Sequence, residues 1–180
     1  MNRENTVLGG EEYLLRKWRE GDEAALRTLI GRYVKLFFPF ALCLSGCYKD
    51  NAYDLVAEAG VQSLQTLCGE NSPPLMVSWI RRVIDKARWM QPLPAFEMTD
   101  HMDLTPEKRV SLKIVKQSLF SLPFESRLLL LLRDQLNLPY DDIADITGIS
   151  MKEARFQTVK ARLQLRAGIE GVLHAKEELL

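Results

Sequence analysis

Apolar residues recur along the chain at spacings of three and four, the pattern of amphipathic helices. The first such stretch has an apolar face made of Leu14, Leu15 and Trp18. Gly21 is expected to end that helix, and Asp22 to cap the next one. The second helix has a predicted inner face of Leu26, Leu29, Tyr33, Leu36 and Phe40. Pro39 should kink this helix or end it early.

Two further helices complete the N-terminal half. Asp50 or Asn51 is placed to cap a third helix that runs to about Leu67, and residues 69–74 form a loop. A fourth helix is predicted from about Leu75 to Trp89, with an inner face made of Met76, Ile80, Val83 and Ala87.

The periodicity stops at Gln91–Pro106. This segment holds three prolines, three acids (Glu97, Asp100 and Asp103) and no lysine or arginine, which is typical of a semi-extended linker. Thr105 and Pro106 then read as the N-cap and first residue of a new helix. Its predicted inner face is Leu112, Val115 and Leu119.

Residues 122–150 have the spacing of a helix-turn-helix. Pro123 opens a leucine-rich helix whose residues 128–132 should be buried, and Asn137 is a plausible left-handed stop. A short helix, Tyr140–Thr147, is followed by Gly148 for the turn. Ser150 and Glu153 then form a capping box for a second helix.

The second helix of this motif has one apolar face and a basic surface. Its inner stripe is predicted to be Ala154, Thr158, Ala161 and Leu165. Lys152–Arg166 holds five bases and one acid, which suits contact with phosphates and base edges in a major groove. A solvated basic helix is the structural alternative, and the preceding turn favours DNA binding. The predicted contact residues are Ser150, Lys152, Arg155, Phe156, Val159, Lys160, Arg162 and Arg166.

These residues carry a resemblance to a known family. Tyr140 and six short segments carry it: Leu122-Pro123, Leu132-Arg133, Ile143-Ala144, Gly148-Ile149-Ser150, Ala161-Arg162 and Leu165-Arg166. Together they resemble region 4 of extracytoplasmic-function sigma factors. The resemblance implies that the basic helix recognises a minus-thirty-five promoter element. Pro139 stands where the family usually has a serine or threonine cap. Phe156 and Val159 stand at commonly polar positions, and they could touch thymine methyl groups or form a protein-binding face.

The N-terminal half resembles region 2 of the same family, beginning at Gly21-Asp22 and Ala25-Leu26. A second set of matching positions resembles the helix that grips the clamp coiled coil of RNA polymerase: Asp50, Asp54, Leu55 and Glu58. We expect Asp54 and Glu58 to lie on an exposed face and Leu55 to add an apolar contact. Ala57 and Gly60 replace the family's usual glutamine and phenylalanine.

The segment Trp79–Ile84 resembles the helix that recognises the minus-ten element. The resemblance implies a DNA-binding set of Arg81, Arg82, Lys86, Arg88 and Trp89, in which cations follow the backbone and rings stack on unpaired bases. Alternatively, Trp79 belongs to the core, which we favour, and Trp89 covers the seam between domains. Lys86 replaces the family's asparagine.

Composition narrows the function classes. Lysine plus arginine (24) equals aspartate plus glutamate (24), so net charge indicates no partner. The polar N-terminus lacks a secretory signal, and Leu36–Leu44 is too short to span a bilayer, so we expect a cytoplasmic protein without membrane insertion. Three cysteines and two histidines without a metal or phosphate-loop motif argue against an enzyme, a cofactor or a metal site.

We therefore expect an all-α fold of two small helical domains: residues 1–90 resembling sigma region 2, a linker over 91–106, and residues 107–180 with the helix-turn-helix of region 4. The expected function is promoter recognition as a sigma factor, with core RNA polymerase, promoter DNA and an anti-sigma factor as partners. The alternative is a sigma-like regulator that binds DNA or protein without directing initiation. We also expect the linker acids to favour a closed arrangement by lying against basic surfaces.

Overall fold

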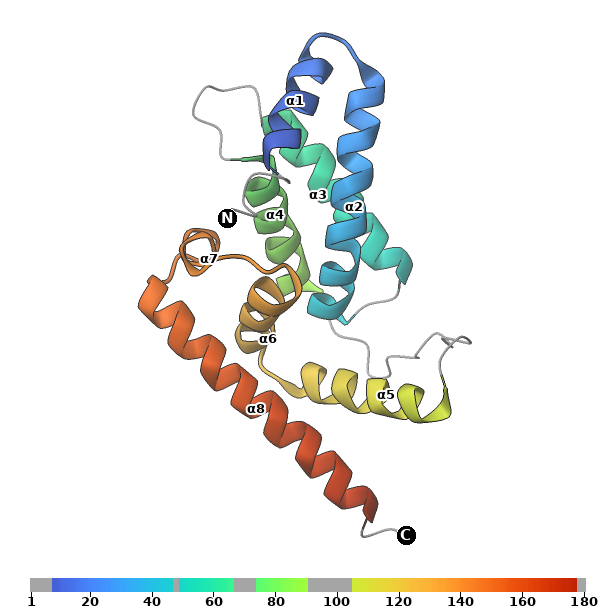
Figure 1. The fold of residues 1–180 in the computed structure, drawn as a ribbon, viewed down its shortest axis with the longest axis vertical. Helices are drawn as coiled ribbons and strands as arrows, with labels where there is room; N and C mark the ends of the chain where they lie inside the picture. The colour runs from blue at the N-terminus through green and yellow to red at the C-terminus, as the bar shows by residue number, and fades with distance from the viewer. Residues whose placement is uncertain (1–7, 47–48, 67–73, 91–104, 178–180) are drawn as a thin grey trace.

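The computed structural model describes residues 8–46, 49–66, 74–90 and 105–177, and every regular element in these ranges is helical. Helices α1 (Leu8–Arg19), α2 (Glu23–Ser45), α3 (Lys49–Thr66) and α4 (Leu75–Trp89) form an N-terminal lobe (Figure 1). A C-terminal lobe follows, made of α5 (Pro106–Ser121), α6 (Phe124–Leu130), the π-helical turn η2 (Leu131–Gln135), α7 (Tyr140–Thr147) and α8 (Met151–Glu177). The all-α fold is as predicted.

The N-terminal lobe is built around α2. The carboxylate of Asp22 accepts hydrogen bonds from the N–H groups of Ala24 and Ala25, and Gly21 has φ +96°, as its predicted place after α1 requires. The buried stripe of α2 passes through Phe37, whereas Leu36, predicted to face inward, is exposed. Helix α2 also continues past Pro39 to Ser45, so the prediction of an early end was wrong.

Helix α3 begins at Lys49, so Asp50 and Asn51 lie in its first turn instead of capping it. An aspartate is favourable both at the N-cap and in the first turn, because the N-terminal end of a helix dipole attracts negative charge. The sequence therefore does not distinguish these two positions. The side chain of Trp79 lies across α3, as the core alternative predicted: its indole N–H donates to the carbonyl of Val56 at 2.9 Å. A Cβ atom at Gly60 would overlap this ring, so the glycine makes room for the tryptophan.

Helix α2 is long and apolar enough to cross a membrane by length and composition alone. Its large side chains are packed within the lobe, where Phe37 and Phe40 are fully buried and Tyr33 and Phe37 contact the ring of Trp79. This is the packing of a core helix.

The C-terminal lobe contains the leucine-rich segment as predicted, with residues 128–132 all buried. Asn137 has φ +54°, the left-handed conformation expected of a helix stop. Helix α5 packs on α8, where Ser118 lies against Gly168, and the buried residues of this segment are Ile114, Ser118 and, just after the helix, Leu122. Val115, predicted to face inward, is exposed, because the stripe is displaced by one residue from the predicted one.

One apolar core is shared by the two lobes. Leu128, Leu132 and Ile143 of the C-terminal lobe belong to the same buried cluster as Leu44 and Ile84 of the N-terminal lobe. Helix α7 lies beside α4 in this junction (Figure 1). The predicted linker falls largely on residues 91–104, which lie outside the described residues. Its boundaries and the contacts expected of Glu97, Asp100 and Asp103 therefore stay predictions.

Candidate nucleic-acid interface

The turn between α7 and α8 has the backbone geometry of a helix-turn-helix. Gly148 adopts φ +75°, and its N–H donates to the carbonyl of Ala144 at 2.8 Å. The Ser150 hydroxyl accepts a hydrogen bond from the N–H of Glu153 at 3.1 Å and so caps α8 as predicted. Ile143 and Ala154 are fully buried on either side of the turn. The turn thereby sets the angle at which α8 leaves the lobe.

Helix α8 packs through small side chains. The inner stripe consists of Ala154, Thr158, Ala161 and Leu165, of which the first three are fully buried and Leu165 is partly buried. The hydroxyl of Thr158 donates to the carbonyl of Ala154 at 2.7 Å, so this polar group is satisfied inside the protein. Because these side chains are short, α8 lies close to the lobe and its opposite side is open to solvent.

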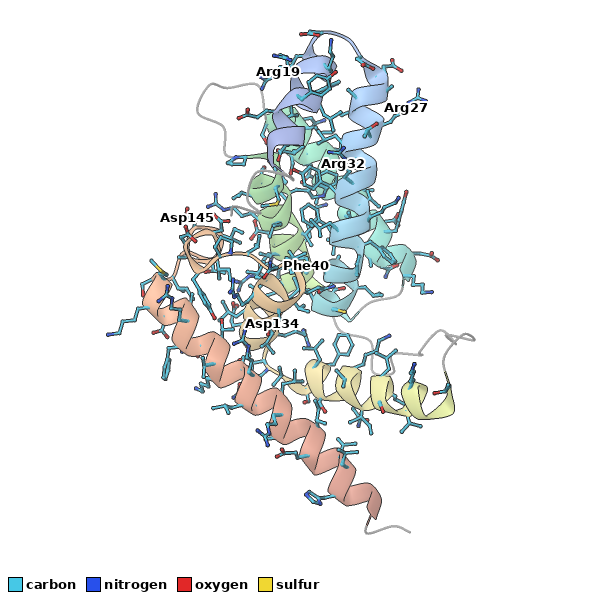
Figure 2. The ribbon with its side chains drawn as sticks, viewed as in Figure 1. Arg19, Arg27, Arg32, Phe40, Asp134 and Asp145 are labelled. Carbon is cyan, nitrogen blue, oxygen red and sulfur yellow. The ribbon has the colours of Figure 1, made fainter. Side chains whose placement is uncertain are left out.

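The residues predicted to contact a minus-thirty-five element are all exposed and all lie at the N-cap or on α8: Ser150, Lys152, Arg155, Phe156, Val159, Lys160, Arg162 and Arg166. Two of them are held in ion pairs. Arg162 binds Asp134, whose side chain is labelled in Figure 2, with Nε to Oδ2 at 3.1 Å, and this hydrogen bond raises the pKa of the guanidinium. Arg166 binds Glu170 at 2.7 Å. Within the described part of the chain, Lys152 and Lys160 form no ion pair.

Tyr140, which is part of the family resemblance, contacts two arginines through its ring. Its ring has the guanidinium of Arg133 at 4.9 Å and that of Arg155 at 5.4 Å. Arg133 also donates to the carbonyl of Leu138 at 2.7 Å, which holds the segment before α7. Tyr140 is the first residue of α7 and thus restrains Arg155 from a neighbouring helix. An aromatic residue at a helix start carries no sequence signal of this contact.

The residues predicted for a minus-ten element come from α4 and are differently placed. Arg81 donates to the backbone carbonyl of Asp145 on α7 at 2.6 Å, and Arg88 binds Glu125 on α6 at 2.6 Å. Lys86 pairs with Glu58 of α3. Arg82 lies 3.4 Å from the side-chain oxygen of Gln62. All four cations of this set therefore have partners inside the protein.

The two tryptophans of α4 have opposite surroundings. Trp79 is 1% exposed, as the core alternative requires, whereas Trp89 is 87% exposed. The alternative that Trp89 covers the seam between the lobes is therefore wrong. Its ring is available for stacking, as the predicted minus-ten set requires.

The predicted polymerase-binding helix is α3. Asp50, Asp54 and Glu58 are exposed, and the last two lie one turn apart, as expected. Leu55 was expected to add an apolar surface contact, but it is only 5% exposed and belongs to the core. The apolar groups at the surface of α3 are instead Tyr53 and Val61, at 55% and 57% exposure. The helical repeat explains the correction, because Leu55 lies on the same face as the buried Ala52 and Ala59.

Comparisons with known proteins bear on both lobes. Residues 112–165 match the family model described as "Sigma-70, region 4". The helix-turn-helix therefore lies in a sigma-70 region 4 segment. No curated protein matches the sequence.

Solved structures share the fold of most of the chain, among them two protein complexes. One is CnrH in complex with the cytosolic domain of CnrY. The match covers 90% of this chain and 98% of CnrH, with 19% sequence identity and a TM-score of 0.69. The other is the sigma factor RpoE in complex with the anti-sigma factor NepR from Bartonella quintana. This match covers 81% of this chain and 96% of RpoE, with 17% sequence identity and a TM-score of 0.62. The fold implied by the resemblance is thus confirmed, and residues 112–165 match the model of sigma-70 region 4.

The matched segment begins within α5 and ends in the middle of α8, and so contains the complete helix-turn-helix. Pro139, which replaces the family's usual capping residue, precedes α7 in extended conformation, and its carbonyl accepts from the N–H of Ile143 at 3.1 Å. The helix starts without a side-chain cap at this position.

One of the three cysteines lies in the described part of the chain. Cys43 is a free thiol, and burial raises its pKa above the usual range. Cys47 and Cys68 lie outside the described residues. Among the described residues there is no cluster of three metal-ligating side chains.

Proposed function

We propose that the chain is a sigma factor of the extracytoplasmic-function type, a non-enzymatic transcription factor that works in the cytoplasm. It binds core RNA polymerase and directs it to promoter DNA. The observation that carries this proposal is the combination of a region 4 match with a fold shared along most of the chain with the sigma factor RpoE.

Each predicted surface has a role in this proposal. The exposed side of α8 recognises a minus-thirty-five element in duplex form, where cations contact phosphates and other side chains contact base edges. The α4 cations and Trp89 contact the minus-ten element, where an exposed ring can stack on an unpaired base. The acids of α3, Asp50, Asp54 and Glu58, bind polymerase.

The two solved relatives also suggest how such a chain is regulated. CnrH is bound to the cytosolic domain of CnrY, and RpoE is bound to the anti-sigma factor NepR. We propose that this chain likewise has a protein inhibitor, an anti-sigma factor.

The decisive experiment is transcription with purified components. The full chain is combined with bacterial core RNA polymerase and a library of promoter fragments, and the 5′ ends of the transcripts are mapped. We expect starts at a constant distance from a shared motif, and none with core polymerase alone. A variant with the acids of α3 reversed, Asp54→Lys/Glu58→Lys, is the control and should give no starts.

A second candidate is a sigma-like regulator that binds DNA or protein without directing initiation. It is favoured by the engagement of Arg81, Lys86 and Arg88 in contacts within the protein. Binding of duplex DNA or polymerase with no specific start in the same experiment would select this candidate over a sigma factor.

A further inference from the structure

An apolar stripe runs along the solvent-facing side of α8. It consists of Phe156, Val159 and Leu163, which are 63%, 51% and 63% exposed. Spacings of three and four place these side chains on one face of the helix. Each also lies two residues from a member of the inner stripe, which on an α-helix is a rotation of about 200°. We call this row the outer stripe, and it points directly away from the C-terminal lobe.

Cations flank the outer stripe on both sides. By helical geometry Arg155 and Arg166 lie along one edge and Lys160 along the other, and Lys152 continues the row toward the N-terminus of α8. Glu153 is the one acid between residues 152 and 166. The charge around the stripe therefore favours a polyanion as the partner that covers it, and the turn before α8 is of the kind that presents a helix to duplex DNA.

The major groove of DNA presents one apolar group. This is the C5 methyl of thymine, whereas the other base edges present hydrogen-bond donors and acceptors. A phenylalanine or valine placed over those polar edges would remove water from them without supplying a hydrogen bond. Phe156 and Val159 lie within the first three turns of α8, the part of a recognition helix that contacts base edges in helix-turn-helix proteins.

We propose that Phe156 and Val159 contact thymine methyl groups and thereby determine which minus-thirty-five sequences are bound. This inference rests on the proposed function, because it requires α8 to enter the groove of promoter DNA. Arg155, held against Tyr140 at the edge of the same surface, supplies the adjoining polar contact. The recognised element then contains thymines at the positions under these two side chains.

The test replaces thymine by deoxyuridine, which removes the methyl group and preserves base pairing. The full chain with core polymerase first selects duplexes from a random library, and each thymine of the selected element is then exchanged singly. We expect about a fourfold loss of affinity at one or two positions, the value of one buried methyl group. When the residue that contacts a given methyl group is changed, by Phe156→Gln or Val159→Gln, the variant should bind the thymine and the deoxyuridine duplex equally well at that position. Leu163→Gln, a change further along the same stripe, should keep the discrimination.

The outcomes separate this inference from the proposed function. A selected element that is insensitive to deoxyuridine, or a sensitivity that survives both glutamine variants, would overturn thymine reading while leaving the sigma function intact. Unchanged DNA binding with lost capture of polymerase by Phe156→Gln would identify the stripe as a protein-binding face and also overturn it. Failure to select any duplex, together with absence of specific transcription starts, would overturn both.

Discussion

Helices α4 and α8 both carry rows of lysine and arginine, and they differ in what lies beneath those rows. Helix α4 packs through large side chains, with Trp79 across Gly60 of α3, and its cations contact α3, α6 or α7. Helix α8 packs through alanines and a threonine, and its outer side faces solvent along its first turns. In α4 all four cations of the predicted set therefore have partners within the protein, whereas among the described residues Lys152 and Lys160 of α8 form no ion pair.

This difference has a functional consequence under the proposed function. The α8 surface can meet duplex DNA in the arrangement seen here, whereas α4 must exchange internal partners before Arg81 and Arg88 contact DNA. These partners lie on the C-terminal lobe, so separation of the lobes at the junction would release both cations. We therefore expect the free chain to be closed and the polymerase-bound chain to be open.

The largest effect is expected from the buried side of α4. Trp79→Ala removes a fully packed ring and should lower the free energy of unfolding by about 3–5 kcal/mol. Chemical denaturation followed by circular dichroism measures this change. Trp89→Ala is the matched control, because its ring is 87% exposed, and it should stay within about 0.5 kcal/mol of the original. Equal losses for the two tryptophans would contradict the difference between the two sides of α4.

The next effect concerns the exposed acids of α3. Asp54→Lys/Glu58→Lys should abolish capture by core polymerase in a pull-down, since the reversed charges would repel a basic partner surface. The fold should be retained, because surface changes usually cost under about 0.5 kcal/mol. Glu12→Lys/Glu23→Lys reverses two exposed acids of α1 and α2 and serves as the control. Undiminished capture by the α3 variant would remove polymerase binding from this helix.

The open surface of α8 is tested by single truncations. Arg155→Ala should weaken binding of promoter duplex by roughly 1–3 kcal/mol and relax specificity at one position. Lys160→Ala should act uniformly across sequences and reduce the salt dependence by about one phosphate contact. Fluorescence anisotropy over a salt series measures both effects. If neither variant, nor the two combined, binds differently from the original chain at low salt, α8 is not the DNA-binding helix.

The smallest effect is expected at the lobe junction. Arg88→Glu places two acids at the contact with Glu125 and should favour the open arrangement, although an exposed ion pair contributes only about 0–1 kcal/mol. The double variant Arg88→Glu/Glu125→Arg should restore closure. Small-angle scattering at low and high salt reports the change as the radius of gyration. A radius that matches separated lobes for all variants and all salt concentrations would show that the free chain is not closed.

The helix boundaries were largely predictable because their signals are local. Thr105, Gly148 and Ser150 act on backbone groups within four residues of themselves, so their identity and spacing were sufficient. The inner stripe of α8 was also predictable, since one helix face repeats through spacings of three and four. The exposed set on α8 followed from that stripe.

The sequence by itself determined the helices, the helix-turn-helix and which helices are basic, because caps, turns and periodicity depend on near neighbours. Only the tertiary structure decided that Gly60 accommodates Trp79 and that the cations of α4 have partners within the protein. These outcomes depend on residues distant in the chain, such as the pairing of Arg81 with the carbonyl of Asp145. A contact of this kind forms when two helices pack, and no local pattern in either helix specifies it.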